Sequence, residues 1–162
     1  MLQLRGTVGA GTTTEAGGTS AVTLTLPFED RRKSRLLARL DDGREAAVVL
    51  PRGTVLVDGV CLLDDQSNVV VTIKAAVETL SVAYASDRHQ MLRAAYHLGN
   101  RHIPVQIGHD WLAYQHDHVL DDLARSLGLV VKVEERPFEP EAGGYGQSHG
   151  HAHGEDHAHH EH

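Results

Sequence analysis

The chain has 162 residues, with 15 Lys and Arg against 22 Asp and Glu and a single cysteine, Cys61. This length fits one ordinary domain or two small ones. The acidic balance, without a basic stripe to neutralise phosphates, argues against a nucleic-acid partner. One cysteine allows neither an intrachain disulfide nor a cysteine-rich zinc site, so metal binding would have to rely on imidazole and carboxylate groups.

Two observations bear on the cellular location. No apolar run approaches the roughly 20 residues that span a bilayer. The N-terminal residues MLQLRGTVGAG lack the apolar core of a signal peptide. We therefore expect a cytoplasmic protein that has no membrane partner, with Cys61 as a small buried hydrophobic residue rather than a reactive thiol.

Residues 1–70 predict a small β-rich domain, a candidate for binding a peptide or another partner. Short apolar runs at 22–26, 46–50 and 54–57 alternate with the turn sequences DDG, PRG and VDG, as short antiparallel strands do. The segment DRRKSRLLARL fits a helix or a strand, and we favour the strand. The glycine-rich GTVGAGTTTEAGG matches neither nucleotide-binding glycine motif and indicates a hairpin or surface loop.

Residues 71–136 predict an α+β domain. The apolar patterns give, in chain order, a strand, a helix, two strands, a helix and a strand, which is the ferredoxin-like βαββαβ order. Asp87 can N-cap the first helix, RHQMLRAAYHLG, with Leu92, Ala95 and Tyr96 facing the core. The next two strands are expected at 102–107 and 111–115. The second helix, VLDDLARSLG, ends at Gly128.

Residues 137–162 are dominated by Pro, Gly and polar side chains, which predicts a disordered tail. Seven of the 13 histidines of the chain lie there, separated by Gly, Ala, Asp and Glu rather than in the uninterrupted run of a purification tag. Imidazole suits Ni²⁺, Cu²⁺ and Zn²⁺, and a floppy segment binds them weakly and exchangeably. The tail histidines are His149, His151, His153, His157, His159, His160 and His162.

Six histidines lie in the body of the chain. We expect His89 and His109 to be solvated. His116 and His118 form H-D-H, which puts both imidazoles on one face if the segment is a strand; alternatively, Asp117 N-caps the second helix between two polar residues. The remaining two, His97 and His102, bracket the exit of the first helix, where Gly99 and Asn100 are expected to supply a left-handed turn.

Three stretches together resemble the urease accessory protein E family, whose members are homodimeric nickel metallochaperones. The most specific is AAYHLGNRHIPVQI; the others are YQHDHVLDDLARSLG and LPFEDRRKSRLLARLDDGREAAVVLPRGTVLVDG. The resemblance covers most of the chain. It implies a β-rich N-terminal domain followed by a ferredoxin-like metal-binding domain, in agreement with the patterns above.

The resemblance also implies a set of nickel ligands. His102, which closes GNRH, would bind Ni²⁺ at the dimer interface from both protomers. His116 and His118 would form peripheral sites, and tail histidines would complete the coordination. For His97 two roles stay open, metal ligation or packing. Zn²⁺ and Cu²⁺ compete for such sites.

The function implied is capture of Ni²⁺ and its delivery, through the urease accessory GTPase, to the urease apoprotein complex, without enzymatic activity. A passive nickel or zinc store is the main alternative. A hydrolase built on the H-D-H residues would lack the glutamate of H-E-x-x-H. A peptide-binding scaffold is the third alternative.

Overall fold

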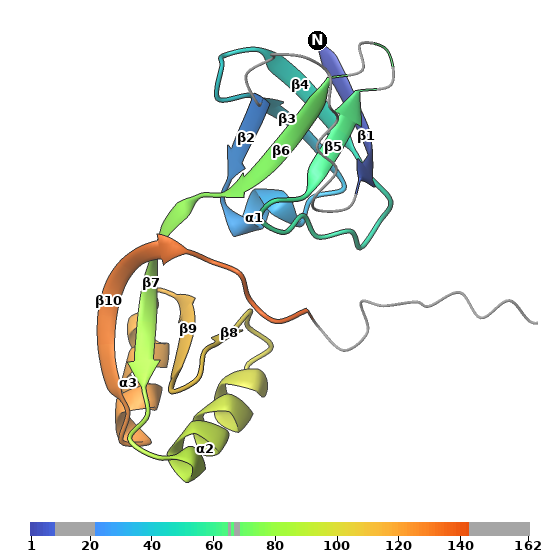
Figure 1. The fold of residues 1–162 in the computed structure, drawn as a ribbon. Helices are drawn as coiled ribbons and strands as arrows, with labels where there is room; N and C mark the ends of the chain where they lie inside the picture. Colours follow the sequence, from blue (N-terminus) through green and yellow to red (C-terminus); the bar gives the residue numbers. More distant parts are fainter. Residues whose placement is uncertain (9–21, 65, 67–68, 143–162) are drawn as a thin grey trace, which may run out of the picture.

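The computed structural model describes residues 1–8, 22–64, 66 and 69–142, which form two β-sheets (Figure 1). Most of the glycine-rich loop and the seven tail histidines lie outside these residues. Within them, no helix has the length and apolar character needed to cross a bilayer.

The first sheet has the strand order β2-β6-β5-β1-β4-β3. The predicted all-antiparallel pairing was wrong for two pairs, because β1 runs parallel to β4 and β2 runs parallel to β6. Apolar alternation shows which face of a strand is buried, but it does not show which strand lies beside it. The strands are β1 (Leu2–Val8), β2 (Val22–Leu26), β3 (Arg35–Arg39), β4 (Glu45–Val49), β5 (Cys61–Asp64) and β6 (Val70–Ala75).

The core of this sheet uses alternate residues of its strands, among them the fully buried Leu4, Leu24 and Ile73. Cys61 is buried, as expected. The ambiguous segment, residues 30–40, contains the end of a short helix, α1 (Phe28–Arg31), and then the favoured strand, β3. No strand forms at 54–57; the N–H of Leu56 donates to the carbonyl of Arg31 instead, between turns that interrupt any ladder.

The second sheet is antiparallel, with the order β10-β7-β9-β8. Asp87 N-caps α2, accepting from the N–H of Gln90 at 2.8 Å, and Gly128 follows α3 with a φ of +90°. The strand expected at 102–107 is reduced to Gln106 and Ile107, since residues 101 and 102 form a turn and residues 103–105 join no ladder. The elements are β7 (Val77–Tyr84), α2 (Arg88–Gly99), β8 (Gln106–Ile107), β9 (Trp111–Gln115), α3 (His118–Ser126) and β10 (Val130–Pro137).

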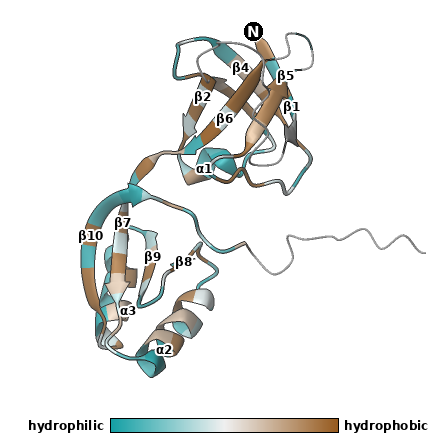
Figure 2. Cartoon of the chain, viewed as in Figure 1, coloured by the Kyte–Doolittle hydropathy of each residue, from teal (hydrophilic) through white to brown (hydrophobic). Residues whose placement is uncertain are grey.

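The two helices cover one face of the second sheet. Ala94 and Leu98 of α2 pack there with Leu112 and Tyr114 of β9. The prediction that Leu92 and Tyr96 face this core was wrong, since they are 61% and 66% exposed. Leu92 and Tyr96 are four residues apart, as are the buried Ala94 and Leu98, so both pairs have the spacing of one helix face. The larger side chains of the first pair therefore led to the wrong choice of the buried face. Figure 2 shows how polar and apolar residues mix along α2.

The opposite face of the second sheet packs against the first domain. Phe28 of α1 and the fully buried Phe138 meet edge to face, 5.4 Å between ring centroids, over Leu80 and Val82. Phe138 directly follows β10, so the start of the segment predicted as a tail is part of the fold. In the sequence RPFEPE, Phe138 is the one aromatic residue among charged residues and prolines, so its burial was not predicted.

Arg31 is the polar centre of this contact between the domains. Its side chain, 1% exposed, donates to the carbonyls of Leu56 and Phe138 and lies 2.5 Å from the carboxylate of Glu139. Glu78 of β7 accepts from the N–H of Phe28 at 2.7 Å. The junction therefore ties α1 to the start of β7 and the end of β10, which are paired at one end of the second sheet.

Candidate metal centre

His102 lies in the turn after α2, with its side chain exposed. Its φ is +55°, and it is the one non-glycine residue with a positive φ in the described part of the chain. Gly99 and Asn100, predicted to supply the left-handed turn, do not: Gly99 is the last residue of α2, and Asn100 has a φ of −65°. A left-handed conformation is uncommon outside glycine, although histidine adopts it more often than most residues. Such strain often marks a functional site.

The turn is held by the helix it follows. The N–H of His102 donates to the carbonyl of Gly99 at 3.0 Å, and that of Arg101 donates to Leu98 at 3.0 Å. These bonds satisfy carbonyls that the end of a helix leaves unpaired. They fix the backbone of His102 while its imidazole stays in solvent, which suits a ligand that must meet an ion at the surface.

Large apolar side chains are exposed on the same helix and on the next strand. Leu92 and Tyr96 of α2 lie on its outward side, and Ile107 of the edge strand β8 is 49% exposed. His97 is half-buried, its ring edge to face with that of Tyr96 at 5.3 Å. His97 thus makes an aromatic contact, which agrees with the packing role left open for it.

His116 and His118 differ in their surroundings. The Nδ1 atom of His116 lies 2.9 Å from Oγ of Ser81 and 3.5 Å from a carboxylate oxygen of Asp121. By contrast, His118 is the exposed first residue of α3. Asp117 between them N-caps α3, the alternative recognised from the sequence. It accepts from the N–H groups of Leu120 and Val119, and these bonds hold its pKa below the usual range.

Among the described residues, no group of three or more His, Cys, Asp or Glu side chains lies close enough to hold a metal ion. His89 is exposed near the start of α2. His109, also exposed, lines a shallow hollow with Asp87, Arg88 and Asp110. The imidazoles of one chain are therefore dispersed in this part of the protein.

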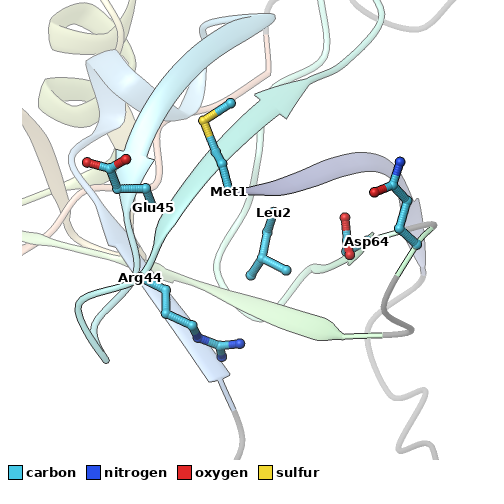
Figure 3. Close-up of a pocket in the computed structure, with 6 residues that line it drawn as sticks. Met1, Leu2, Arg44, Glu45 and Asp64 are labelled. Atoms are coloured by element: carbon cyan, nitrogen blue, oxygen red, sulfur yellow. The ribbon is translucent and has the colours of Figure 1, made fainter.

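A second hollow lies on the first domain, away from every predicted site residue (Figure 3). Glu45 of β4 and Arg44 in the turn before it border the hollow, together with Leu2 of the adjacent β1 and Met1, which precedes β1. Asp64 is 3% exposed and accepts from the N–H of Gln3 at 2.8 Å. The carboxylate of Asp64 is thus engaged in holding β1.

Three residues around His116 were not recognised from the sequence: Ser81, Tyr114 and Asp121, each at most 2% exposed. Each is a polar residue at a core-facing position, in LSVA of β7, LAYQ of β9 and VLDD of α3. A polar side chain on a buried face needs a hydrogen-bonding partner. That signal was present in the sequence, but the partner could not be identified without the pairing of β7 with β9.

The fold and the site define a class: a two-domain, β-rich protein that carries exposed histidines on an α+β second domain. Comparison with known proteins agrees and is more specific. Residues 6–76 match the family model for the N-terminal domain of the UreE urease accessory protein, and residues 78–162 match that for its C-terminal domain. The chain therefore belongs to the UreE family.

Individual relatives support the same assignment. The urease accessory protein UreE of Alkalilimnicola ehrlichii is 56% identical over 124 residues, 76% of each chain. UreE of Pseudomonas putida strain W619 is 55% identical over 123 residues, again 76% of each chain. UreE of Proteus mirabilis is 51% identical over 127 residues, 78% of each chain.

Proposed function

We propose that the protein is a cytoplasmic nickel metallochaperone that captures Ni²⁺ and delivers it, through the urease accessory GTPase, to the urease apoprotein complex. Membership of the UreE family supports a role in urease maturation. The observation that carries the nickel assignment is His102, an exposed imidazole on a backbone held in the left-handed conformation. The protein acts by binding and transfer rather than by catalysis.

The metal-binding unit is the second domain, with a ferredoxin-like fold. The antiparallel strand order β10-β7-β9-β8 and the chain order βαββαβ support this fold. We place the domain boundary at Ala76 rather than at residue 70, because β6 pairs within the first sheet as far as Ala75. The first domain binds a protein partner, and residues 143–162 supply further imidazoles.

The principal site forms between two copies of the chain. His102 from each protomer of a two-fold homodimer supplies an imidazole, so one residue provides two ligands. The exposed Leu92, Tyr96 and Ile107 support a protein contact beside it, since grouped apolar side chains mark interaction surfaces. An all-imidazole site exchanges its ion more readily than a thiolate site, which suits delivery.

Further ligands have subordinate roles. His116 and His118 form peripheral sites and tail histidines close over the interface ion, while His97 packs near it. Zn²⁺ and Cu²⁺ bind the same imidazoles. The rival function is a passive nickel or zinc store, which the tail alone would serve.

Titration calorimetry and native mass spectrometry with Ni²⁺ test the proposal on the intact chain, His102→Asn, and a chain ending at Gly146. Asparagine tolerates the left-handed conformation, so His102→Asn removes the imidazole with little effect on the turn. We expect the shortened chain to keep one tight ion per two protomers and His102→Asn to lose it. His89→Asn, an exposed histidine of α2, is the matched control and should bind like the intact chain.

Two outcomes would contradict the proposal. Retention of the tightest site in His102→Asn would exclude the interface assignment. Loss of all binding on removal of residues 147–162 would favour the passive store.

A further inference from the structure

A cluster of buried polar side chains lies beneath His116. Ser81 and Tyr114 are fully buried and Asp121 is 2% exposed, whereas the side chain of His116 is 44% exposed. One oxygen of Asp121 accepts from the hydroxyl of Tyr114 at 3.0 Å. Its other oxygen faces Nδ1 of His116 at 3.5 Å and the guanidinium of Arg125 at 3.7 Å. The cluster thus spans from the core of the second domain to its surface.

The fold assembles this cluster from three elements. Ser81 of β7 and Tyr114 of β9 are directly paired, so both side chains lie on the helix-covered face of the sheet. His116, two residues beyond Tyr114, is on the same side. Asp121 is one turn into α3, and its N–H donates to the carbonyl of the N-cap residue Asp117 at 2.9 Å. The N-cap therefore fixes the position of Asp121 along the axis of α3, next to His116.

The chemistry of the cluster selects one tautomer of His116. The carboxylate of Asp121 can only accept hydrogen bonds, and it faces Nδ1 together with Oγ of Ser81. The hydroxyl of Ser81 can accept from or donate to Nδ1, so the carboxylate decides: a proton on Nδ1 gives Asp121 a donor, whereas a proton on Nε2 would aim the Nδ1 lone pair at a buried carboxylate. The Nδ1–H form leaves the Nε2 lone pair directed away from the cluster.

We propose that Asp121 and Ser81 are positioning residues that hold His116 as the Nδ1–H tautomer and present its Nε2 to a divalent cation at the surface. Metal-binding histidines commonly donate their second N–H to a carboxylate in this way, and loss of that partner typically costs about 10–100-fold in metal affinity. The part of the proposal that concerns cation binding rests on the proposed function, whereas the tautomer of His116 is independent of it.

The same geometry separates the two members of the H-D-H motif. The side chain of His118 makes no hydrogen bond to any described residue, so its imidazole is free to rotate. His116 is oriented before an ion arrives, and therefore loses less conformational entropy on binding. The structure thus assigns His116 as the anchoring ligand of the peripheral site and His118 as the adaptable one.

Nitrogen-15 NMR of the imidazoles tests the tautomer in the full-length, metal-free protein at pH 8. His116→Gln identifies the resonances of His116. We expect a pyrrole-like Nδ1 and a pyridine-like Nε2. In Asp121→Asn the amide can donate to Nδ1, which should move the population toward Nε2–H. Asp122→Asn is the matched control, since that neighbouring carboxylate is 78% exposed and pairs with Arg125 instead; it should leave His116 unchanged.

Titration with Zn²⁺, a diamagnetic probe, extends the test to metal binding at single-residue resolution. The Nε2 resonance of His116 should report binding at about 10–100-fold higher Zn²⁺ in Asp121→Asn than in Asp122→Asn. Ser81→Ala should show a smaller shift in the same direction, and it serves if Asp121→Asn fails to fold. A pyridine-like Nδ1 in the unmodified protein, or an unchanged tautomer in Asp121→Asn and Ser81→Ala, would overturn the proposal. Loss of nickel from His102 would not affect it.

Discussion

The left-handed backbone conformation of His102 costs conformational free energy, whereas the neighbouring residues have ordinary negative φ angles. A non-glycine residue in this region costs roughly 1–2 kcal/mol relative to the right-handed form, and histidine lies toward the tolerant end of that range. At His102 the cost accompanies an exposed imidazole that makes no hydrogen bond, ion pair or ring contact with the described residues. We infer that the residue is kept for binding and not for stability.

This inference predicts that His102→Gly raises the free energy of unfolding by about 0.5–1 kcal/mol while nickel binding at the tight site is lost. Urea denaturation of the metal-free protein measures the first effect. Arg101→Gly is the control, because Arg101 has no positive φ and glycine there should destabilise. Equal or lower stability of His102→Gly would show that the turn is not strained.

Asp117 offers a prediction with a defined pH dependence. Its pKa is lowered by the N–H groups of Leu120 and Val119. A carboxyl group whose pKa falls on folding stabilises the protein above the unfolded pKa, about 3.9 for aspartate. That contribution is lost as the pH falls through the lower, folded pKa.

We therefore expect Asp117→Ala to unfold at a lower temperature than the unmodified protein at pH 6, with the gap closing as the pH drops below about 3.9. Circular dichroism melts at several pH values measure this. Asp117→Asn still caps the helix, so it should keep much of the stability at pH 6 but show less of the pH dependence. If the difference in unfolding temperature between Asp117→Ala and the unmodified protein did not change with pH, the charge of the Asp117 carboxylate would not contribute to stability.

Among the features of helices and strands, helix ends were predicted best from the sequence, because neighbouring residues determine them. The N-cap aspartates and the glycine after α3 identified both helices of the second domain to within a residue or two. Burial faces and strand partners were less predictable. Leu92 and Tyr96 have helical spacing but face outward, and the parallel pairing of β1 with β4 joins residues more than forty positions apart. These features depend on contacts between elements, which a single sequence does not display.

The site divides in the same way. His102 was predicted as a ligand from its motif and stays a prediction, but its left-handed conformation was assigned to Gly99 and Asn100, whose residue types favour it. Ser81 and Asp121 lie on different elements from His116, so only the assembled fold brings them together.

Gly128 and Gly43 form a matched pair for testing how helices α2 and α3 are joined. Both have a φ of +90°, but a Cβ on Gly128 would lie 2.5 Å from Nε2 of Gln90, whereas a Cβ on Gly43 meets open space. Gln90 holds the helix ends together, donating to the carbonyl of Leu127 at 3.3 Å and accepting from the N–H of Ser86 at 2.8 Å.

Both Gly→Ala variants should destabilise by about 1 kcal/mol from backbone strain, and Gly128→Ala should lose about a further 1 kcal/mol because Gln90 must release its hydrogen bonds. Chemical denaturation compares them. In a Gln90→Ala background the difference between the two glycine substitutions should disappear; if it persists, the clash with Gln90 is not its cause.

For the whole molecule, Arg31 is the buried charged residue between the two domains. Its guanidinium is buried between them and bonds to the chain on both sides. Removing one partner of a buried charge pair typically costs about 3–5 kcal/mol. Glu139 is 31% exposed, so water can solvate it in part and the lower end of that range applies.

We expect the unmodified protein to unfold in one calorimetric transition and Arg31→Met to unfold in two, one for each domain. Differential scanning calorimetry distinguishes these cases. Arg32→Met is the control, since Arg32 is 51% exposed, and its two charge contacts, with Glu29 and with the ring of Phe28 at 6.0 Å, stay within its own segment; it should leave a single transition. A single transition in Arg31→Met would mean that the apolar contact of Phe28 with Phe138 suffices.

The burial of Phe138 affects how any shortened gene for this protein should be interpreted. Glu139 contacts Arg31 at 2.5 Å and the N–H of Glu141 donates to the carbonyl of Val105 at 2.9 Å, so the residues leading to the histidines are structural. A stop codon placed before Phe138 would lower urease activation in cells by reducing the amount of folded protein, and the loss could be mistaken for a requirement for histidines. Only alleles that end beyond Glu141 separate the two effects.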